Sequence, residues 1–262
     1  MALKEWYFGL HDSSTGQYKS GMDASGWAMV CTAGAVTSPT IYTNASGSAT
    51  LTATNTIAVV TIANGYCRFW TDSSVTSLDI SYLTATGECG LLKAVSPNTQ
   101  HMLPVQTGQM DFTLWVPVAY LAASAVVDTT LDLPANLIIT DAMLKVVATD
   151  SAVTVDVGFE NATESGDLDG LLDGMLCTNA GLILGSGTIT NGSNIDYVAN
   201  TNGKYGVLLA TVIAGADAVA TVGGITRLWY ETDGTIKSLV YTPSNSTTFT
   251  GAICLKYMRT MS

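Results

Sequence analysis

Charged residues are scarce in this chain of 262 residues, where Asp, Glu, Lys and Arg together make up only 12%. That is about half the share found in an average soluble domain. The charges are also unbalanced, with ten basic against twenty-one acidic residues and a formal net charge of −11. Because DNA and RNA binding requires a basic surface to meet the phosphates, this composition argues against a nucleic-acid partner.

Cysteine and histidine, which most often hold zinc, are few and dispersed. The five cysteines are odd in number, widely spaced and without a C-x-x-C pair, so neither a disulfide framework nor a zinc site is expected. Buried free thiols fit this usage better. His11 and His101 lie in no H-E-x-x-H motif, and phosphate-binding or nucleophile-elbow motifs are also missing. We therefore expect no cofactor and no enzymatic activity.

Long hydrophobic runs are missing as well. The most apolar stretch, Leu114 to Val127, is too short to span a bilayer and contains Pro117. The first twelve residues have no apolar core of the kind that signal peptides carry. We expect no membrane partner and no secretion.

Period-two alternation of apolar and polar residues is the main pattern that the chain does contain. The segments SLDISYL (77–83), VTVDVGF (153–159) and AICLKYM (252–258) each alternate in this way, which predicts half-buried strands of antiparallel sheets. Turn signals separate such segments, for example Asn64-Gly65 and Asp233-Gly234, and the second predicts a hairpin over residues 228–241. The predicted class is all-β, with β-sandwich or jelly-roll-like domains.

One lapse in the alternation suggests a domain boundary. In the segment SPNTQHMLPVQTGQMD (96–111), two prolines bracket polar residues. We therefore expect an N-terminal β module over residues 1–100, a short linker over 101–110 and a C-terminal jelly-roll-like β domain over 111–262.

The N-terminal segment KEWYFGL (4–10) is unusually aromatic for a chain terminus. Exposed aromatic residues often mark interfaces, so Trp6, Tyr7, Phe8 and Leu10 are candidates for an anchor on a partner or a neighbouring subunit. The alternative is that they form an edge strand in a sheet of the same chain.

Two further aromatic groups, YCRFW (66–70) and RLWYE (227–231), could form a platform on which sugars stack. These residues lie within strand patterns rather than in loops, so core or sheet-face packing is the favoured interpretation.

The stretch ESGDLDGLLDG (164–174) contains the highest local density of acidic residues. An EF-hand loop starting at Asp167 would need Glu at its twelfth position, where Thr178 stands, so Asp167, Asp169 and Asp173 are only a weak calcium candidate. A glycosidase carboxylate pair is a second alternative. A short helix or a turn between strands, capped by its own acidic residues, is the preferred interpretation.

Two parts of the chain resemble modules of bacteriophage virion proteins. The segments PTIYTNASG (39–47), NGYCRFW (64–70) and LDI (78–80) are similar to an N-terminal β module of such proteins. The strand DVG (156–158), the following GDLDG turn (166–170) and the final GAICLKYMR (251–259) resemble the C-terminal β domain of head-decoration and head-fibre proteins. The resemblance places Asp167, Asp169 and Gly170 in a family turn and implies no catalytic residues.

The resemblance implies a non-enzymatic structural protein of the virion, assembled in the host cytoplasm. Such a protein would decorate the capsid or form a head fibre, with the major capsid protein or other virion proteins as partners. Homo-oligomers are expected, with a trimer favoured. The alternative is a tail or receptor-binding component that recognises a cell-surface glycan. A glycan depolymerase ranks last, because the chain shows none of the repeats of a β-helix.

Overall fold

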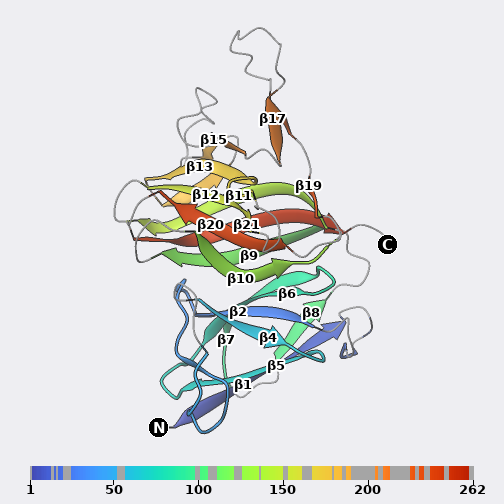
Figure 1. The fold of residues 1–262 in the computed structure, drawn as a ribbon. Coiled ribbons are helices and arrows are strands. Elements are labelled where there is room, and N and C mark those ends of the chain that lie inside the picture. Colours follow the sequence, from blue (N-terminus) through green and yellow to red (C-terminus); the bar gives the residue numbers. More distant parts are fainter. Residues whose placement is uncertain are drawn as a thin grey trace. The chain divides into compact units, whose positions relative to one another are not determined.

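A computed structural model describes residues 2–12, 15, 17–19, 25–51, 57–97, 101–105, 111–120, 126–135, 137–149, 153–160, 167–178, 180–184, 187–189, 204–205, 209–212, 225–227, 230–232, 237–244 and 248–259. Every regular element in these residues is a β-strand and none is a helix, which confirms the all-β prediction (Figure 1). The chain divides into two compact units, Met1–Ala119 and Tyr120–Ser262.

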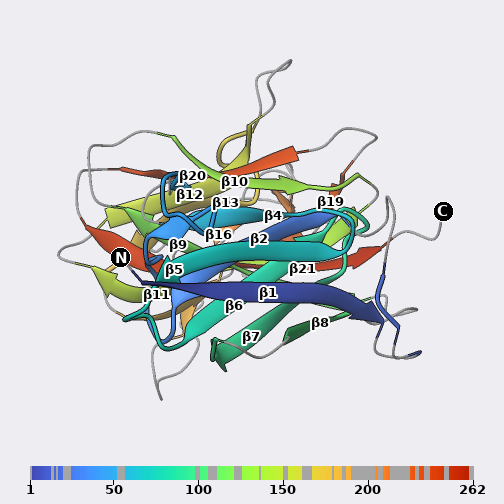
Figure 2. The ribbon, with the colours of Figure 1, turned by 90° about the horizontal axis from the view of Figure 1, so that it is seen from below.

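The first unit contains two four-stranded sheets among the described residues. One has the order β3 (Ile41–Tyr42), β5 (Tyr66–Asp72), β1 (Leu3–Asp12) and β8 (His101–Val105). The other has the order β4 (Ala58–Ile62), β2 (Gly26–Thr32), β6 (Leu78–Thr84) and β7 (Cys89–Val95). Neighbouring strands run antiparallel except β1 and β8, which are parallel (Figure 2).

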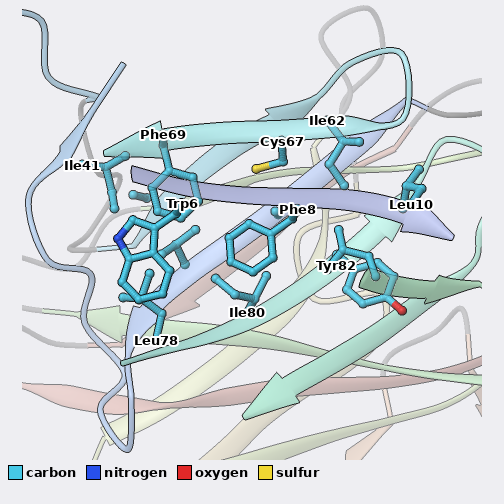
Figure 3. Packing of buried hydrophobic residues seen from close by; sticks show 14 residues of the cluster. Trp6, Phe8, Leu10, Ile41, Ile62, Cys67, Phe69, Leu78, Ile80 and Tyr82 are labelled. Atoms are coloured by element: carbon cyan, nitrogen blue, oxygen red, sulfur yellow. The ribbon is translucent and has the colours of Figure 1, made fainter. Parts of the chain in front are cut away.

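A shared apolar core joins these two sheets into a sandwich. Side chains from β1 and β5 on one sheet and from β2, β4 and β6 on the other belong to one buried cluster. Figure 3 shows Trp6 and Phe8 pointing toward Leu78 and Ile80 of the facing sheet. Burial of apolar area at about 25 cal/mol per Å² makes this cluster the main stabilising feature of the unit.

The Asn64-Gly65 turn forms as the sequence predicts. Both residues have positive φ, 52° and 85°, and Ala63 and Tyr66 exchange two backbone hydrogen bonds of 2.8 and 3.0 Å. Positive φ at both central positions is the geometry that an Asn-Gly pair favours. The strands on either side, β4 and β5, then continue into different sheets, so the turn forms a corner of the sandwich.

The predicted linker, residues 101–110, begins with a strand. His101 to Val105 form β8, which pairs with β1, and Leu103 lies fully buried. Pro104 is compatible with this strand because β8 lies at the edge of its sheet, where a missing N–H does not interrupt an inner ladder. Residues 106–110 lie outside the described residues.

The second unit contains a five-stranded sheet among its described residues. Its strands follow the order β10 (Val127–Leu133), β20 (Lys237–Pro243), β12 (Val153–Glu160), β13 (Leu172–Cys177) and β16 (Lys204–Tyr205). On β12, Val153, Val155, Val157 and Phe159 are buried, which confirms the period-two prediction for this strand.

A six-stranded sheet is formed by β15 (Gly187–Ile189), β14 (Gly181–Leu184), β11 (Leu137–Thr149), β21 (Phe249–Arg259) and β9 (Asp111–Tyr120), with β19 (Tyr230–Glu231) also paired to β11. The boundary between the two units falls near the end of β9. A two-stranded ribbon of β17 (Ala210–Val212) and β18 (Ile225–Arg227) completes the described strands.

The hairpin predicted over residues 228–241 does not form. Its two halves, β19 and β20, belong to different sheets, because β19 pairs with β11 while β20 pairs with β10 and β12. Asp233-Gly234 itself lies outside the described residues.

Candidate functional site

The apolar side chains of β1 belong to the chain's own core. Trp6 is 1% exposed, while Phe8 and Leu10 are fully buried. The rings of Trp6, Phe8 and Phe69 are nearly parallel, with centroids 5.9 to 6.5 Å apart. The indole N–H of Trp6 donates to Thr71 Oγ1 over 2.9 Å, so the one polar atom of this side chain is satisfied inside the core.

This arrangement corrects the anchor expectation for Trp6, Phe8 and Leu10, whose side chains are not available to a partner. β1 lies between β5 and β8, so strands pair with both of its edges. Its alternation then turns every second residue inward. Of the four anchor candidates, only Tyr7 lies on the outward side of the strand, where it is partly exposed.

The acidic turn, residues 167–171, has a structural explanation. The carbonyl oxygen of Asp167 accepts a 2.8 Å hydrogen bond from the N–H of Phe159 on β12, and the N–H of Leu171 donates to the carbonyl oxygen of Val157 over 3.0 Å. The turn therefore lies directly against β12. Gly158 permits this approach, because a Cβ there would be 2.0 Å from the carbonyl oxygen of Asp167.

Asp156 fixes the next part of the same segment. Its Oδ1 accepts a 2.7 Å hydrogen bond from the N–H of Gly174, which has a φ of 65°. β12 and β13 shift register between Val155 and Val157, which puts Asp156 at an irregular point of the ladder. The DVG strand and residues 167–170 thus pack together. Of the two preferred alternatives, a short helix or a turn, the described residues form the turn, and strand β13 follows it.

The carboxylates near this turn repel one another. Burial raises the pKa of Asp156, and the charges of Asp173 and Asp169 add to the rise, although the Gly174 N–H opposes it. Burial and the hydrogen bond with Asp169 also raise the pKa of Asp167. Within the described ranges, no group of three or more His, Cys, Asp or Glu side chains is arranged to hold a metal ion. Glu164 lies outside those ranges.

The outward side of β1 and β5 carries a cluster of three tyrosines, Tyr7, Tyr18 and Tyr66, referred to below as the tyrosine face. The ring centroids of Tyr7 and Tyr66 are 5.4 Å apart and those of Tyr66 and Tyr18 are 6.2 Å apart. Tyr18 is 42% exposed and Tyr66 is 38% exposed. Burial, followed by the neighbouring Tyr66, raises the pKa of the Tyr7 hydroxyl.

Tyr18 comes from a segment that folds back along the end of β1. Backbone hydrogen bonds join Asp12 to Gln17 over 2.8 Å and Lys19 to Leu10 over 3.0 Å. The ammonium of Lys19 also lies 3.4 Å from a carboxylate oxygen of Glu88, a buried residue.

Gly9 provides the space in which the Tyr18 ring lies over the sheet. A Cβ added at Gly9 would be 2.7 Å from Cε1 of Tyr18. Because the strand has no side chain at this position, the ring rests on the backbone of β1 beside Tyr66. The glycine therefore sets the geometry of the tyrosine face.

Polar groups adjoin the tyrosine face on the same side of the sheet. Arg68, the cross-strand partner of Tyr7, forms an ion pair with Glu5, and both side chains are exposed. The guanidinium of Arg68 also lies 4.9 Å from the centre of the Trp70 ring. The imidazole of His11 meets Tyr18 edge-on, with centroids 5.9 Å apart. The face thus combines exposed aromatic rings with a positively charged group, Arg68, and a negatively charged group, Glu5, that can form hydrogen bonds.

Part of this face could be predicted from the sequence and part could not. The sequence singled out Tyr66 and Trp70 with Phe69 as a possible sugar platform; Phe69 is buried in the core, whereas Tyr66 and Trp70 lie on the outward side. Tyr18 was missed, because it lies in no strand pattern. The placement of Trp229 and of the Tyr230 side chain lies outside the described residues.

All five cysteines are free thiols, and four of them are buried. Burial raises the pKa of Cys31, of Cys67 and of Cys177 to about 12, so these three stay protonated at neutral pH. Cys89, on β7, is partly exposed.

Comparisons with protein-family models, with curated proteins and with solved structures find no match to this chain. In the part of the chain that the structure describes, no helix has the length and apolar content to cross a membrane.

Proposed function

We propose that the chain is a non-enzymatic structural protein of a bacteriophage virion, a capsid decoration or head-fibre protein with jelly-roll-like β domains. It docks on the major capsid protein or on another virion protein, and it assembles with copies of itself, with a trimer favoured. The proposal starts from the resemblance of residues 39–80, 156–170 and 251–259 to modules of such proteins.

The observation that carries the proposal is that the acidic segment and its neighbour Asp156 serve the fold, because they form hydrogen bonds with backbone N–H groups of nearby residues. Asp156 holds the Gly174 N–H, and the Asp167 carbonyl holds the Phe159 N–H, so the motif joins two strands. This structural role agrees with a non-enzymatic protein, whereas a carboxylate pair for catalysis would have to face a substrate-sized space.

The N-terminal motif has the same character. The Oδ1 of Asn44 accepts the Ser48 N–H over 3.1 Å, and Gly47 has a φ of 70°, so PTIYTNASG closes a tight turn after β3. The Asn64-Gly65 turn then begins β5. These two N-terminal motifs of the resemblance, residues 39–47 and 64–70, therefore form turns in the framework of the first unit.

A tail or receptor-binding component that recognises a glycan is the second candidate. The observation that favours it is the tyrosine face, since exposed aromatic side chains mark binding surfaces. Both candidates are binding functions, and they differ in the place that the chain takes in the particle.

The test is to purify particles from an infected lysate in a density gradient and label them with a gold-conjugated antibody to the native chain. Label over the heads, with the chain sedimenting in the particle band, is the expected result. Label confined to the tails selects the second candidate. A chain that stays at the top of the gradient, with unlabelled particles, overturns both.

A further inference from the structure

The two most exposed rings of the tyrosine face, Tyr18 and Tyr66, present a small area. An aromatic side chain has roughly 200 Å² of surface, so 42% of Tyr18 and 38% of Tyr66 together expose about 160 Å². A stable protein interface buries about 800 Å² on each partner and has an apolar centre. The neighbours of the tyrosines here are instead Arg68, Glu5 and His11. This size and this composition match a small ligand.

The arrangement of the rings narrows the chemistry of that ligand. The ring planes of Tyr7 and Tyr66 differ by 31° and those of Tyr66 and Tyr18 by 38°, so the three rings form a bent platform. A quaternary ammonium ion is bound by rings that close around it as a cage. A platform instead offers flat area on which a ligand with an extended apolar face can lie.

The negative net charge of the chain argues against nucleic acids, which are a second class of ligand that stacks on tyrosines. Nucleobases also stack on tyrosines, but nucleic acids need a basic surface for their phosphates. The whole chain carries a net charge of −11, and Arg68, a cation beside the platform, is already paired with Glu5. The face therefore does not suit an anionic ligand, and the ring arrangement does not suit a quaternary ammonium ion, which leaves a neutral ligand with an apolar face.

From these observations we infer that the tyrosine face binds a neutral carbohydrate. The apolar C–H face of a pyranose ring stacks on Tyr66 and Tyr18, while its hydroxyl groups exchange hydrogen bonds with the tyrosine hydroxyls and with the Arg68–Glu5 pair. Gly9 is the positioning residue, because it leaves room for the Tyr18 ring over the backbone of β1, beside Tyr66. This inference stands on the geometry alone and does not depend on where the chain resides in a particle.

The test starts with the full chain on an array of neutral and sialylated oligosaccharides, followed by calorimetric titration with the neutral oligosaccharide that gives the strongest signal. We expect Tyr66→Ala and Tyr18→Ala each to weaken binding at least tenfold. Gly9→Ala keeps all three tyrosines but displaces Tyr18, so it should weaken binding as well. Leu91→Ala, at a residue that is 41% exposed on β7 of the other sheet, is the matched control and should bind as the unaltered chain does.

Folding is checked separately from binding, since a misfolded variant would also lose the ligand. Each variant is used only if its thermal unfolding lies within a few degrees of that of the unaltered chain, and Tyr66→Phe, which keeps the ring, serves as the milder change where Tyr66→Ala fails this check. The inference is overturned if no neutral oligosaccharide binds, if the three variants bind as tightly as Leu91→Ala, or if tetramethylammonium chloride binds at this face and sugars do not.

Discussion

Replacing Gly158 by alanine should selectively destabilise the second unit. The new Cβ would meet three backbone atoms, at 2.0 Å from the Asp167 carbonyl oxygen and at 2.5 and 2.7 Å from the carbonyl group of Leu168. Backbone atoms cannot rotate away, so the turn must move off β12. Overpacking of this kind costs about 1–3 kcal/mol, and each lost hydrogen bond adds about 1 kcal/mol.

Two hydrogen bonds are lost in this displacement, those from Phe159 N–H to Asp167 and from Leu171 N–H to Val157. The expected loss of unfolding free energy is therefore about 3–5 kcal/mol. Hydrogen exchange followed by mass spectrometry in rising urea measures it unit by unit, which matters because two units need not unfold in one transition. Peptides from 153–177 should lose protection early, while peptides from 2–97 keep it.

Gly174→Ala is the matched control. Gly174 has a φ of 65° but no atom within 4 Å of an added Cβ, so its replacement brings only the left-handed strain of about 1–2 kcal/mol. If Gly158→Ala is no more destabilising than Gly174→Ala, the close packing of the acidic turn on β12 is refuted.

Three further outcomes follow from the electrostatics of the described residues. Asp79 accepts hydrogen bonds from the N–H groups of Ala94 and Gly34 and from the Lys93 ammonium, at 2.8, 3.1 and 2.8 Å; burial alone would raise its pKa, but these partners outweigh burial and lower it. Asp79→Ala should therefore cost about 2–4 kcal/mol in urea unfolding at pH 7, and the difference from the unaltered chain should fade as the pH falls through the lowered pKa. The pKa of Asp156 is raised in the folded chain. The contribution of this carboxyl to stability is therefore present below about pH 3.9 and is lost as the pH rises through the folded-state pKa. The variant Asp156→Asn should be at least as stable as the unaltered chain at pH 7, and a marked drop in the Tm of the variant would contradict this. In a thiol titration at pH 8, Cys89 should react first, while Cys31, Cys67 and Cys177 react only after denaturation; fast labelling of Cys67 in the folded chain would show that the core is open.

The sequence predicted strands well where alternation and turn chemistry agree. β12 has its four apolar residues buried, as its period-two pattern requires, and Asn64-Gly65 forms the turn that its φ preferences favour. These features depend on neighbouring residues alone, so a local pattern is sufficient to identify them.

Pairing between distant strands could not be predicted in this way. β6 is buried on both faces rather than on one, since Asp79 on its polar side is covered by the Gly34 turn and by Ala94 of β7. β19 and β20 separate into two sheets because their partners, β11 on one side and β10 and β12 on the other, lie far away in the sequence. Alternation fixes which residues share a face and leaves open which strand they meet.

The same limit explains the outcome for the candidate site. Alternation in KEWYFGL separates Trp6 and Phe8 from Tyr7, but it does not tell which of the two sides faces inward. The packing of this sheet against β2, β4 and β6 of the other sheet decides that the side of Trp6 and Phe8 forms the core. Tyr18 reaches the outward side through a fold-back segment that has no pattern of its own, and only the structure places its ring over Gly9.

One side of β5 packs into the core of the first unit, and we propose that the opposite side, which carries the tyrosine face, binds a ligand. Urea unfolding of Phe69→Ala and Tyr66→Ala, two changes on opposite sides of this one strand, tests the claim most directly. Phe69 is 1% exposed, so its truncation should cost about 3–5 kcal/mol. Tyr66 is 38% exposed, and its truncation should cost about 1 kcal/mol or less. Equal losses for the two variants would mean that the tyrosine face serves the fold, and the assignment of a binding surface to it would be contradicted.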